Sequence, residues 1–146
     1  FIMTFKNKLT FSKVDNSVID DLYDLLKMRK YSISHQSLPS FKKHKKFVES
    51  EPYLHWYTIS LNKLIIGTFY IKEDNSVGIN LQKDNEFFLK EVLEFILNNF
   101  SPMKAKPSFI PEYFYSNISS DNKALINIMD SIGLEKIQVS YKLKLN

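Results

Sequence analysis

The sequence contains no cysteine and very little glycine. The absence of cysteine excludes disulfide bonds, cysteine nucleophiles and thiolate metal sites. Only three of the 146 residues are glycine, Gly67, Gly78 and Gly133, where average usage gives about ten. A P-loop and a G-x-G-x-x-G loop both need glycines close together, and these three are isolated. Both nucleotide-binding motifs are therefore excluded.

Arginine is nearly absent as well. Arg29 is the only arginine among twenty basic residues, and the formal net charge is +4. The lysines are scattered, apart from a group of four at Lys42, Lys43, Lys45 and Lys46. A solvated lysine surface and attraction to an anionic ligand both explain this charge. Base recognition in nucleic acids depends largely on arginine, so nucleic acid is not an expected partner.

Long hydrophobic runs are missing too. No apolar run approaches the roughly 18 to 20 residues of a membrane helix, and no signal-peptide pattern is present. Hydrophobic residues make up 44% and aromatic residues 14%, enough for the core of one domain. We expect a single cytoplasmic domain over residues 1–146 with no membrane contact. Met3 is the expected start, so Phe1 and Ile2 are expected to remain from cloning or from a larger product.

Hydrophobic periodicity predicts strands and helices in an order typical of a mixed α/β domain. The expected strands cover residues 4–14, 53–60, 64–72, 76–81, 112–118 and 135–145. The expected helices cover residues 15–30, 40–50, 84–100 and 121–132. The predicted fold class is α/β of the α+β kind, with a central mixed, mostly antiparallel sheet flanked by helices.

Local signals mark several boundaries of these elements. Ser17 and Asp20 form a capping pattern for the first helix, Asp84 or Asn85 caps the third, and Gly133 suits a left-handed helix end. The residues 61–63 predict a tight hairpin turn. In the last predicted strand the odd positions from 137 to 145 are apolar, which predicts an antiparallel strand with one buried face.

This order, together with several residues, resembles the acyl-CoA N-acetyltransferases of the GNAT superfamily. The stretches Asn117-Ile118, Asn122-Lys123-Ala124 and Ile132-Gly133-Leu134 are similar to its pattern of Asn, Asn-x-x-Ala/Ser, a helix and Leu-Gly-Phe. Further residues resemble a bacterial subgroup of this superfamily that comes from surface-glycan and sugar-nucleotide loci. They are Arg29, Ile33-Ser34-His35, Pro39, His44, Phe47-Val48, Pro52-Tyr53, Trp56-Tyr57 and the closing stretch 137–143. The resemblance implies the GNAT fold over the whole chain, acetyl-CoA as co-substrate and a small-molecule amine, such as an amino sugar nucleotide, as acceptor.

The same resemblance implies a cofactor side. Family members bind the CoA pyrophosphate with a Gln/Arg-x-x-Gly-x-Gly/Ala loop, whose backbone N–H groups contact phosphate. Here the corresponding stretch, residues 82–88, is shortened, has no glycine and carries Asp84 and Glu86, which repel phosphate. Met129 stands where many members have a tyrosine that protonates the leaving thiolate. The implied cofactor-binding residues are Leu81, Gln82, Lys83, Asn85, Asn117 and Asn122.

Two histidines are candidate catalytic bases. His35 lies between the first two predicted helices, where the resembled fold has its acceptor loop, and histidine titrates near neutral pH. An ordinary polar loop residue is the alternative. His44 lies on the apolar face of the second predicted helix, so a hydrogen-bonded core histidine competes with a base in the substrate pocket. No H-E-x-x-H pattern is present, so no metal site is expected.

Arg29, Ser34, Trp56 and Tyr57 are the predicted acceptor-binding residues. A guanidinium binds phosphate or carboxylate with two parallel hydrogen bonds, but Arg29 also suits a helix C-terminus. Trp56 and Tyr57 equally suit core packing, and Asn117 and Asn122 equally suit local backbone hydrogen bonds. Two functions stay open: an active N-acetyltransferase, and a GNAT-fold binding or scaffold protein that has lost catalysis along with its pyrophosphate loop.

Overall fold

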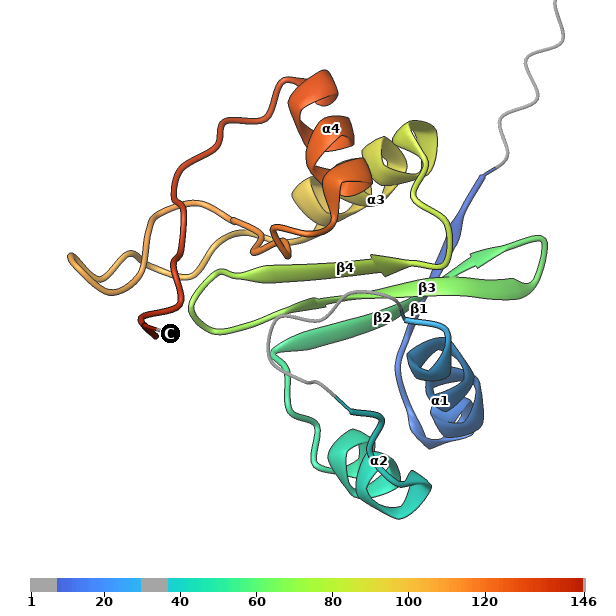
Figure 1. Cartoon of the computed structure of the whole chain (residues 1–146). Helices are drawn as coiled ribbons and strands as arrows, with labels where there is room; N and C mark the ends of the chain where they lie inside the picture. The colour runs from blue at the N-terminus through green and yellow to red at the C-terminus, as the bar shows by residue number, and fades with distance from the viewer. Residues whose placement is uncertain (1–7, 30–36, 146) are drawn as a thin grey trace, which may run out of the picture.

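A computed structural model describes residues 8–29 and 37–145 of the chain (Figure 1). Their elements, in chain order, are β1 (Thr10–Lys13), the 3-10 helix η1 (Asn16–Val18), α1 (Ile19–Lys27), α2 (Phe41–Glu49), β2 (His55–Leu61), β3 (Leu64–Ile71), β4 (Val77–Leu81), α3 (Glu86–Asn99) and α4 (Lys123–Ile132). Among the described residues, no helix combines the length and the apolar character that crossing a membrane requires.

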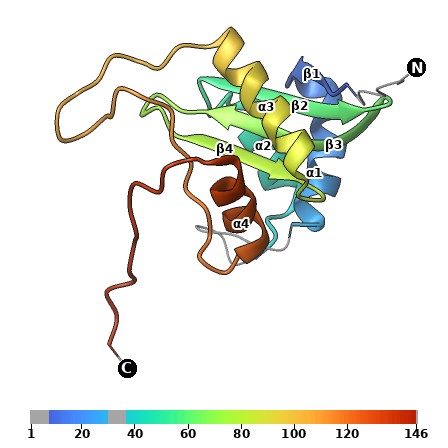
Figure 2. The ribbon, with the colours of Figure 1, turned by 90° about the horizontal axis from the view of Figure 1, so that it is seen from above.

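The four strands form one antiparallel sheet in the order β1-β2-β3-β4, between two layers of helices. Figure 1 shows α3 and α4 on one side of the sheet and α1 and α2 on the other. In the view from above, α3 crosses over the strands and α4 lies beside β4, at the edge of the sheet (Figure 2). The predicted α+β class, with a sheet flanked by helices, is confirmed.

The predicted hairpin is formed by β2 and β3. Asn62 and Lys63 connect them, with φ of 50° and 67°. Two consecutive residues with positive φ match the right-handed twist of paired strands, which is why this turn closes a two-residue hairpin. The tight turn expected over 61–63 is therefore confirmed.

The main core lies between the sheet and α3. Phe69 of β3 is completely buried, and its ring centroid lies 5.2 Å from that of Tyr57 and 5.9 Å from that of Phe95. Helix α3 turns Leu89, Val92 and Ile96 into this core, because residues three and four positions apart share one helix face. The sheet and α3 thus hold each other by apolar burial.

The first helix begins differently from the prediction. The Asp15 carboxylate accepts the N–H of Ser17 at 2.8 Å and starts the 3-10 turn, and α1 follows at Ile19. The capping pattern of Ser17 and Asp20 is therefore wrong: an aspartate two positions earlier already satisfies the first N–H groups. Ser40, Asn85 and Gly133 do occupy helix ends, and Gly133 has a φ of 90°.

Two predicted strands do not form over the described residues. Residues 112–118 touch β4 through one isolated parallel bridge between Ser76 and Tyr115, and residues 134–145 contain no strand. Leu143 and Leu145 are each 98% exposed, so the predicted buried face is absent. An alternating pattern says which side chains share a face, but a strand also needs a neighbour with which to exchange hydrogen bonds.

Asn75 connects the sheet to the long segment that follows α3. It is completely buried with a φ of 70°. Its Nδ2 donates to the carbonyl oxygens of Met103 (3.0 Å) and Pro111 (2.8 Å), and its Oδ1 accepts the N–H of Met103 at 2.6 Å. One side chain thereby holds both ends of this loop, and so places residues 112–119 beside β4.

Candidate functional site

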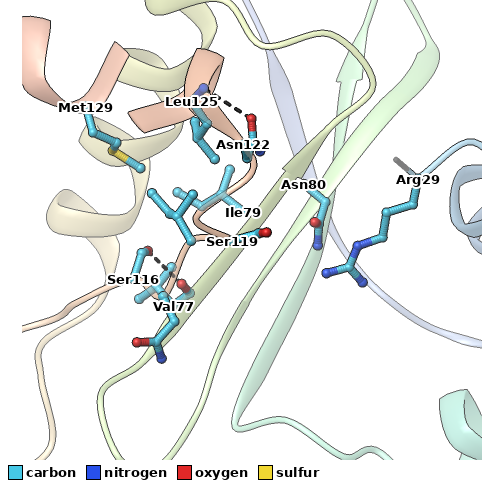
Figure 3. A pocket seen from close by; sticks show the side chains of 11 residues that line it. Arg29, Val77, Ile79, Asn80, Ser116, Ser119, Asn122, Leu125 and Met129 are labelled. Atoms are coloured by element: carbon cyan, nitrogen blue, oxygen red, sulfur yellow. Dashed lines mark hydrogen bonds between the residues drawn. The ribbon is translucent and has the colours of Figure 1, made fainter. Parts of the chain in front are cut away.

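A small cavity lies at the free edge of β4, where residues 117–119 separate from the strand. Its volume is about 60 Å³, enough for a group of a few non-hydrogen atoms. Its lining residues are Arg29, Val77, Ile79, Asn80, Ser116, Asn117, Ile118, Ser119, Asn122, Leu125 and Met129. Figure 3 shows these side chains reaching it from both sides of β4.

Three hydrogen bonds define where the separation starts. The N–H of Val77 donates to the carbonyl of Tyr115 at 2.7 Å, and the N–H of Tyr115 donates to the carbonyl of Asn75 at 3.2 Å. The Ser116 hydroxyl then donates to the carbonyl of Val77 at 2.6 Å. Beyond Ser116 the chain leaves β4 and continues towards α4, and the cavity fills the angle between them.

The backbone of β4 presents hydrogen-bonding groups to this angle. Lys72 donates to the carbonyl of Ser76 and Gln82 to that of Ile66, so the even-numbered residues of β4 bond to β3. Because an antiparallel ladder alternates, the odd-numbered residues turn their N–H and C=O groups to the open edge. The bond from Val77 to Tyr115 agrees with this alternation. Ile79 therefore offers one donor and one acceptor to the cavity.

Helix α4 supplies the second wall. Asn122 caps the helix by accepting the N–H of Leu125 at 3.2 Å, and Leu125 is its buried residue. Met129 lies one turn further along the same face. Asn117 precedes the helix and accepts a bond from Gln138 at 3.5 Å. This wall therefore combines apolar side chains with two carboxamides.

Arg29 reaches the cavity from the opposite face of the sheet. Asn80 pairs with Thr68 and Gly78 with Tyr70, so the side chains of Asn80, Thr68 and Tyr70 share the face that carries α1 and α2. Arg29 follows α1, is exposed, and its guanidinium points towards Asn80 (Figure 3). The cavity thus wraps around the edge of β4, with Ile79 and α4 on one side and Arg29 and Asn80 on the other.

Two stacked tyrosines lie on the same face as Asn80. The ring of Tyr70 covers Gly78 so closely that a Cβ there would lie 2.1 Å from the ring. Tyr53 stacks on Tyr70, with centroids 4.0 Å apart. Burial, more than the neighbouring Tyr70, raises the pKa of Tyr53 to about 12, against the smaller opposite effect of Arg29. Tyr53 therefore keeps its hydroxyl proton at neutral pH.

Comparisons with solved structures identify this architecture. An aminoglycoside N-acetyltransferase, AAC(6')-Ib11, matches 86% of this chain and 85% of its own with 14% identity and a TM-score of 0.56. The spermidine/spermine N-acetyltransferase SpeG from Vibrio cholerae, in mutant forms, matches 88% and 80% with 13% identity and a TM-score of 0.58. A possible acetyltransferase from Clostridium difficile 630 matches 94% and 98% with 10% identity and a TM-score of 0.56.

The chain has the GNAT fold. No protein-family model matches the sequence, and no curated protein matches it either. The named neighbours are similar in fold at low identity, so they carry no residue roles to this chain. They also give no support to the predicted surface-glycan subgroup.

Within the GNAT fold, the cavity brings together three of the predicted site residues. Arg29, Asn117 and Asn122 all line it. Asn80, Ser116 and Ser119 also line the cavity, and they were not among the site residues predicted from the sequence. A polar residue at Asn80 inside an apolar strand was the available signal, because such a residue needs a partner or a ligand.

Trp56 and Tyr57, which were predicted to bind the acceptor substrate, lie on β2 away from the cavity. Tyr57 stacks on Phe69 within the main core. Trp56 packs on the opposite face, beside the cluster of Ile19, Leu22 and Val48. Its Nε1 is buried and has no hydrogen-bond partner among the described residues. This packing favours the core interpretation of both, and their acceptor roles stay predictions.

The histidine predictions have different outcomes. His44 is 6% exposed, and its Nε2 lies 2.9 Å from the carbonyl oxygen of Ile19. Tyr23 and Phe41 lie beside its ring. These contacts favour the core histidine over the pocket base. His35 and Ser34 lie outside the described residues.

The predicted pyrophosphate region surrounds the start of α3. Asn85 accepts the N–H groups of Phe87 (2.8 Å) and Phe88 (3.2 Å), so the helix end is already capped by a side chain. Burial raises the pKa of Asp84 next to it. Gln82 donates to the sulfur of Met28 at 3.8 Å, and Lys83 is exposed. Contacts of CoA with these residues and with Leu81 stay predictions.

Proposed function

We propose that the chain is an acetyl-CoA-dependent N-acetyltransferase that acts on a primary amine of a small molecule. The observation that carries this proposal is the separation of residues 117–119 from β4. Within a GNAT fold, this separation leaves a cavity lined by Asn117 and Asn122 and by the outward-facing backbone of Ile79. An extended thioester arm lying along β4 would find ladder hydrogen bonds at this free edge.

The reaction follows from what surrounds the acetyl group. The amine nitrogen attacks the thioester carbonyl carbon, the C–S bond breaks, the amine loses a proton and the CoA sulfur gains one. The N–H of Ile79 would donate to the carbonyl oxygen, where negative charge develops. The described cavity residues include no carboxylate or imidazole, so the proton leaves to water or to His35, the predicted base. An amino sugar nucleotide remains the proposed acceptor.

A second function is favoured by the start of α3. Asn85 already occupies the N–H groups that a pyrophosphate would bind, Asp84 adds negative charge, and Met129 cannot donate a proton. These three features suit a GNAT-fold binding or scaffold protein without catalysis. The two functions differ in whether acetyl-CoA binds and whether CoA is released.

Calorimetric titration with acetyl-CoA tests the proposal first. We expect saturable binding, followed by thiol release once an acceptor amine is added. Met129→Trp should abolish binding because the larger side chain fills the cavity, whereas Asn127→Trp, on the exposed side of α4, should leave it unchanged. Binding without thiol release across amines would favour the scaffold function. No heat at millimolar acetyl-CoA would overturn the acetyltransferase and leave the scaffold function.

A second measurement addresses the missing glycine loop. Asp84→Asn removes a negative charge beside the predicted pyrophosphate position, so we expect tighter acetyl-CoA binding. The variant should also unfold at slightly higher temperature at neutral pH. The raised pKa of Asp84 means that its ionised form is less favourable in the folded chain than in the unfolded one. Weaker acetyl-CoA binding in Asp84→Asn would show that CoA phosphates lie elsewhere.

A further inference from the structure

The cavity carries one positive charge and no negative one. Among the described residues that line it, Arg29 is the only charged side chain, and the others are apolar, hydroxyl or carboxamide. Acceptors with several ammonium groups are held by carboxylates, since unpaired like charges cost binding energy. A cavity whose single charge is a guanidinium disfavours such polycations.

The position of Arg29 suits an acceptor rather than the thioester. The outward backbone of Ile79 and the wall of α4 lie on one side of the β4 edge, and Arg29 and Asn80 lie on the other. An acetyl group beside Ile79 would therefore have Arg29 across the edge of the strand. Arg29 is an exposed residue, so a molecule can reach it from solvent.

The chemistry of the surroundings points the same way. A guanidinium presents a planar fork of N–H donors that matches phosphate or carboxylate oxygens, and the carboxamide of Asn80 adds a donor beside it. The stacked rings of Tyr53 and Tyr70 offer a flat surface on the same face.

We propose that the acceptor is a small amine that also carries an anionic group, a phosphate or a carboxylate, and that Arg29 with Asn80 binds this group at the rim of the cavity. This inference rests on the proposed acetyltransferase function and adds which residues bind the anionic group of its acceptor. Arg29 then determines which amines are accepted. Polycationic amines, of the kind named for two structural neighbours, are then poor acceptors.

Binding of acceptors without acetyl-CoA tests this directly. The probes are glucosamine, glucosamine 6-phosphate, an amino sugar with a carboxylate in place of the phosphate, and spermidine. Each is titrated calorimetrically. We expect the phosphate or the carboxylate to bind about tenfold more tightly than glucosamine, as for an exposed charged hydrogen bond. That preference should shrink as salt is raised to about 1 M. Equal affinity for glucosamine and both anionic sugars, or tighter binding of spermidine, overturns the inference.

Variants locate the effect. Arg29→Gln should weaken the anionic sugar about tenfold and leave glucosamine unchanged, and Arg29→Lys should lie between. Lys27→Gln removes the same charge two residues away without touching the cavity and should change either affinity less than twofold. Equal losses for both sugars in Arg29→Gln would make Arg29 structural. Where Arg29→Gln unfolds, Arg29→Lys and the salt series decide.

The outcomes separate this inference from the proposed function. Failure of acetyl-CoA to bind overturns the acetyltransferase, while the acceptor titrations still report on Arg29. Acetylation of spermidine that is unaffected by Arg29→Gln keeps the acetyltransferase and overturns the anionic acceptor.

Discussion

Residues 8–100 and residues 101–145 of this chain differ in how they are held. Every buried hydrophobic residue of the described structure belongs to the first region, except Leu125 of α4. The second region exposes large apolar side chains, with Phe109 at 84% and Leu143 at 98%. The sheet with α1, α2 and α3 therefore builds its own core, and the rest of the chain attaches through few contacts.

The difference explains where the cavity lies. The seam between the two regions runs along the free edge of β4, where Asn75 and Tyr115 make the connecting hydrogen bonds. A tightly packed boundary leaves no space for a ligand. A boundary made of a few polar contacts can separate locally, as residues 117–119 do from β4, and leave backbone groups available to bind a ligand.

The largest expected effect contrasts a core residue with an exposed one. Phe69→Ala should lower the free energy of unfolding by about 3 to 5 kcal/mol, because it removes a completely buried ring. Leu143→Ala, at 98% exposure, should change it by less than about 0.5 kcal/mol. Denaturant unfolding measures both. Similar losses in the two variants would mean that residues 134–145 have a buried partner.

The connection itself should come next in size. Asn75→Ala leaves backbone groups of Met103 and Pro111 unpaired and strains a positive φ, at a cost of about 2 to 4 kcal/mol. Asn75→Gly isolates the hydrogen bonds, because glycine tolerates this φ. In both variants amide hydrogen exchange should accelerate over 101–119 more than in β2 and β3. Uniform acceleration would argue against a separate second region. Asn98→Ala, at an exposed position of α3, serves as the control.

A change deep in the first region should leave the seam intact. His44→Ala removes the bond to the Ile19 carbonyl and should cost about 1 to 3 kcal/mol of stability. If His44 is only structural, kcat for acetyl transfer at a temperature where the variant is folded stays at the wild-type value. Loss of kcat with an unchanged melting temperature would restore its predicted catalytic role.

The smallest effect concerns acid. Burial raises the pKa of Asp74, but hydrogen bonds from Ser76, the charge of Lys72 and the Tyr115 hydroxyl together outweigh it, so the pKa is lowered from its ordinary value. A carboxyl with a lowered folded-state pKa stabilises the protein above its unfolded pKa, and this contribution disappears as pH falls through the folded value. Between pH 5 and about 3, the wild type should thus lose more stability than Asp74→Asn. An equal loss would mean that the bonds at Ser76 and Tyr115 do not stabilise the seam, and Asp130→Asn is the matched control.

Sequence patterns predicted the parts of this fold that depend on neighbouring residues. The hairpin turn at Asn62 and Lys63, the cap at Asn85 and the helix end at Gly133 are all local, and the structure confirms them. The strands expected over 112–118 and 135–145 failed because pairing depends on distant partners. The long loop held by Asn75 has no periodic signal at all.

The candidate site was predicted in part for the same reason. The resemblance selected Arg29, Asn117 and Asn122, and the fold brings these three together. Asn80, Ser116 and Ser119 come to line the cavity only because the chain leaves the edge of β4 after Ser116, which no spacing in the sequence encodes. From the sequence, a site role and core packing were equally compatible with Trp56, Tyr57 and His44. Their contacts in the structure are those of core side chains.

The exposed stretch 137–145 also bears on how the protein behaves at high concentration. Alternating apolar residues on an unpaired extended chain are a template for cross-chain strand pairing and aggregation. Lys142 and Lys144 are the polar positions of that alternation, between Tyr141, Leu143 and Leu145, and repulsion between their charges opposes stacking of identical chains. These two lysines act as gatekeepers: replacing both with glutamine should shift the onset of aggregation to lower protein concentration without changing the folded core.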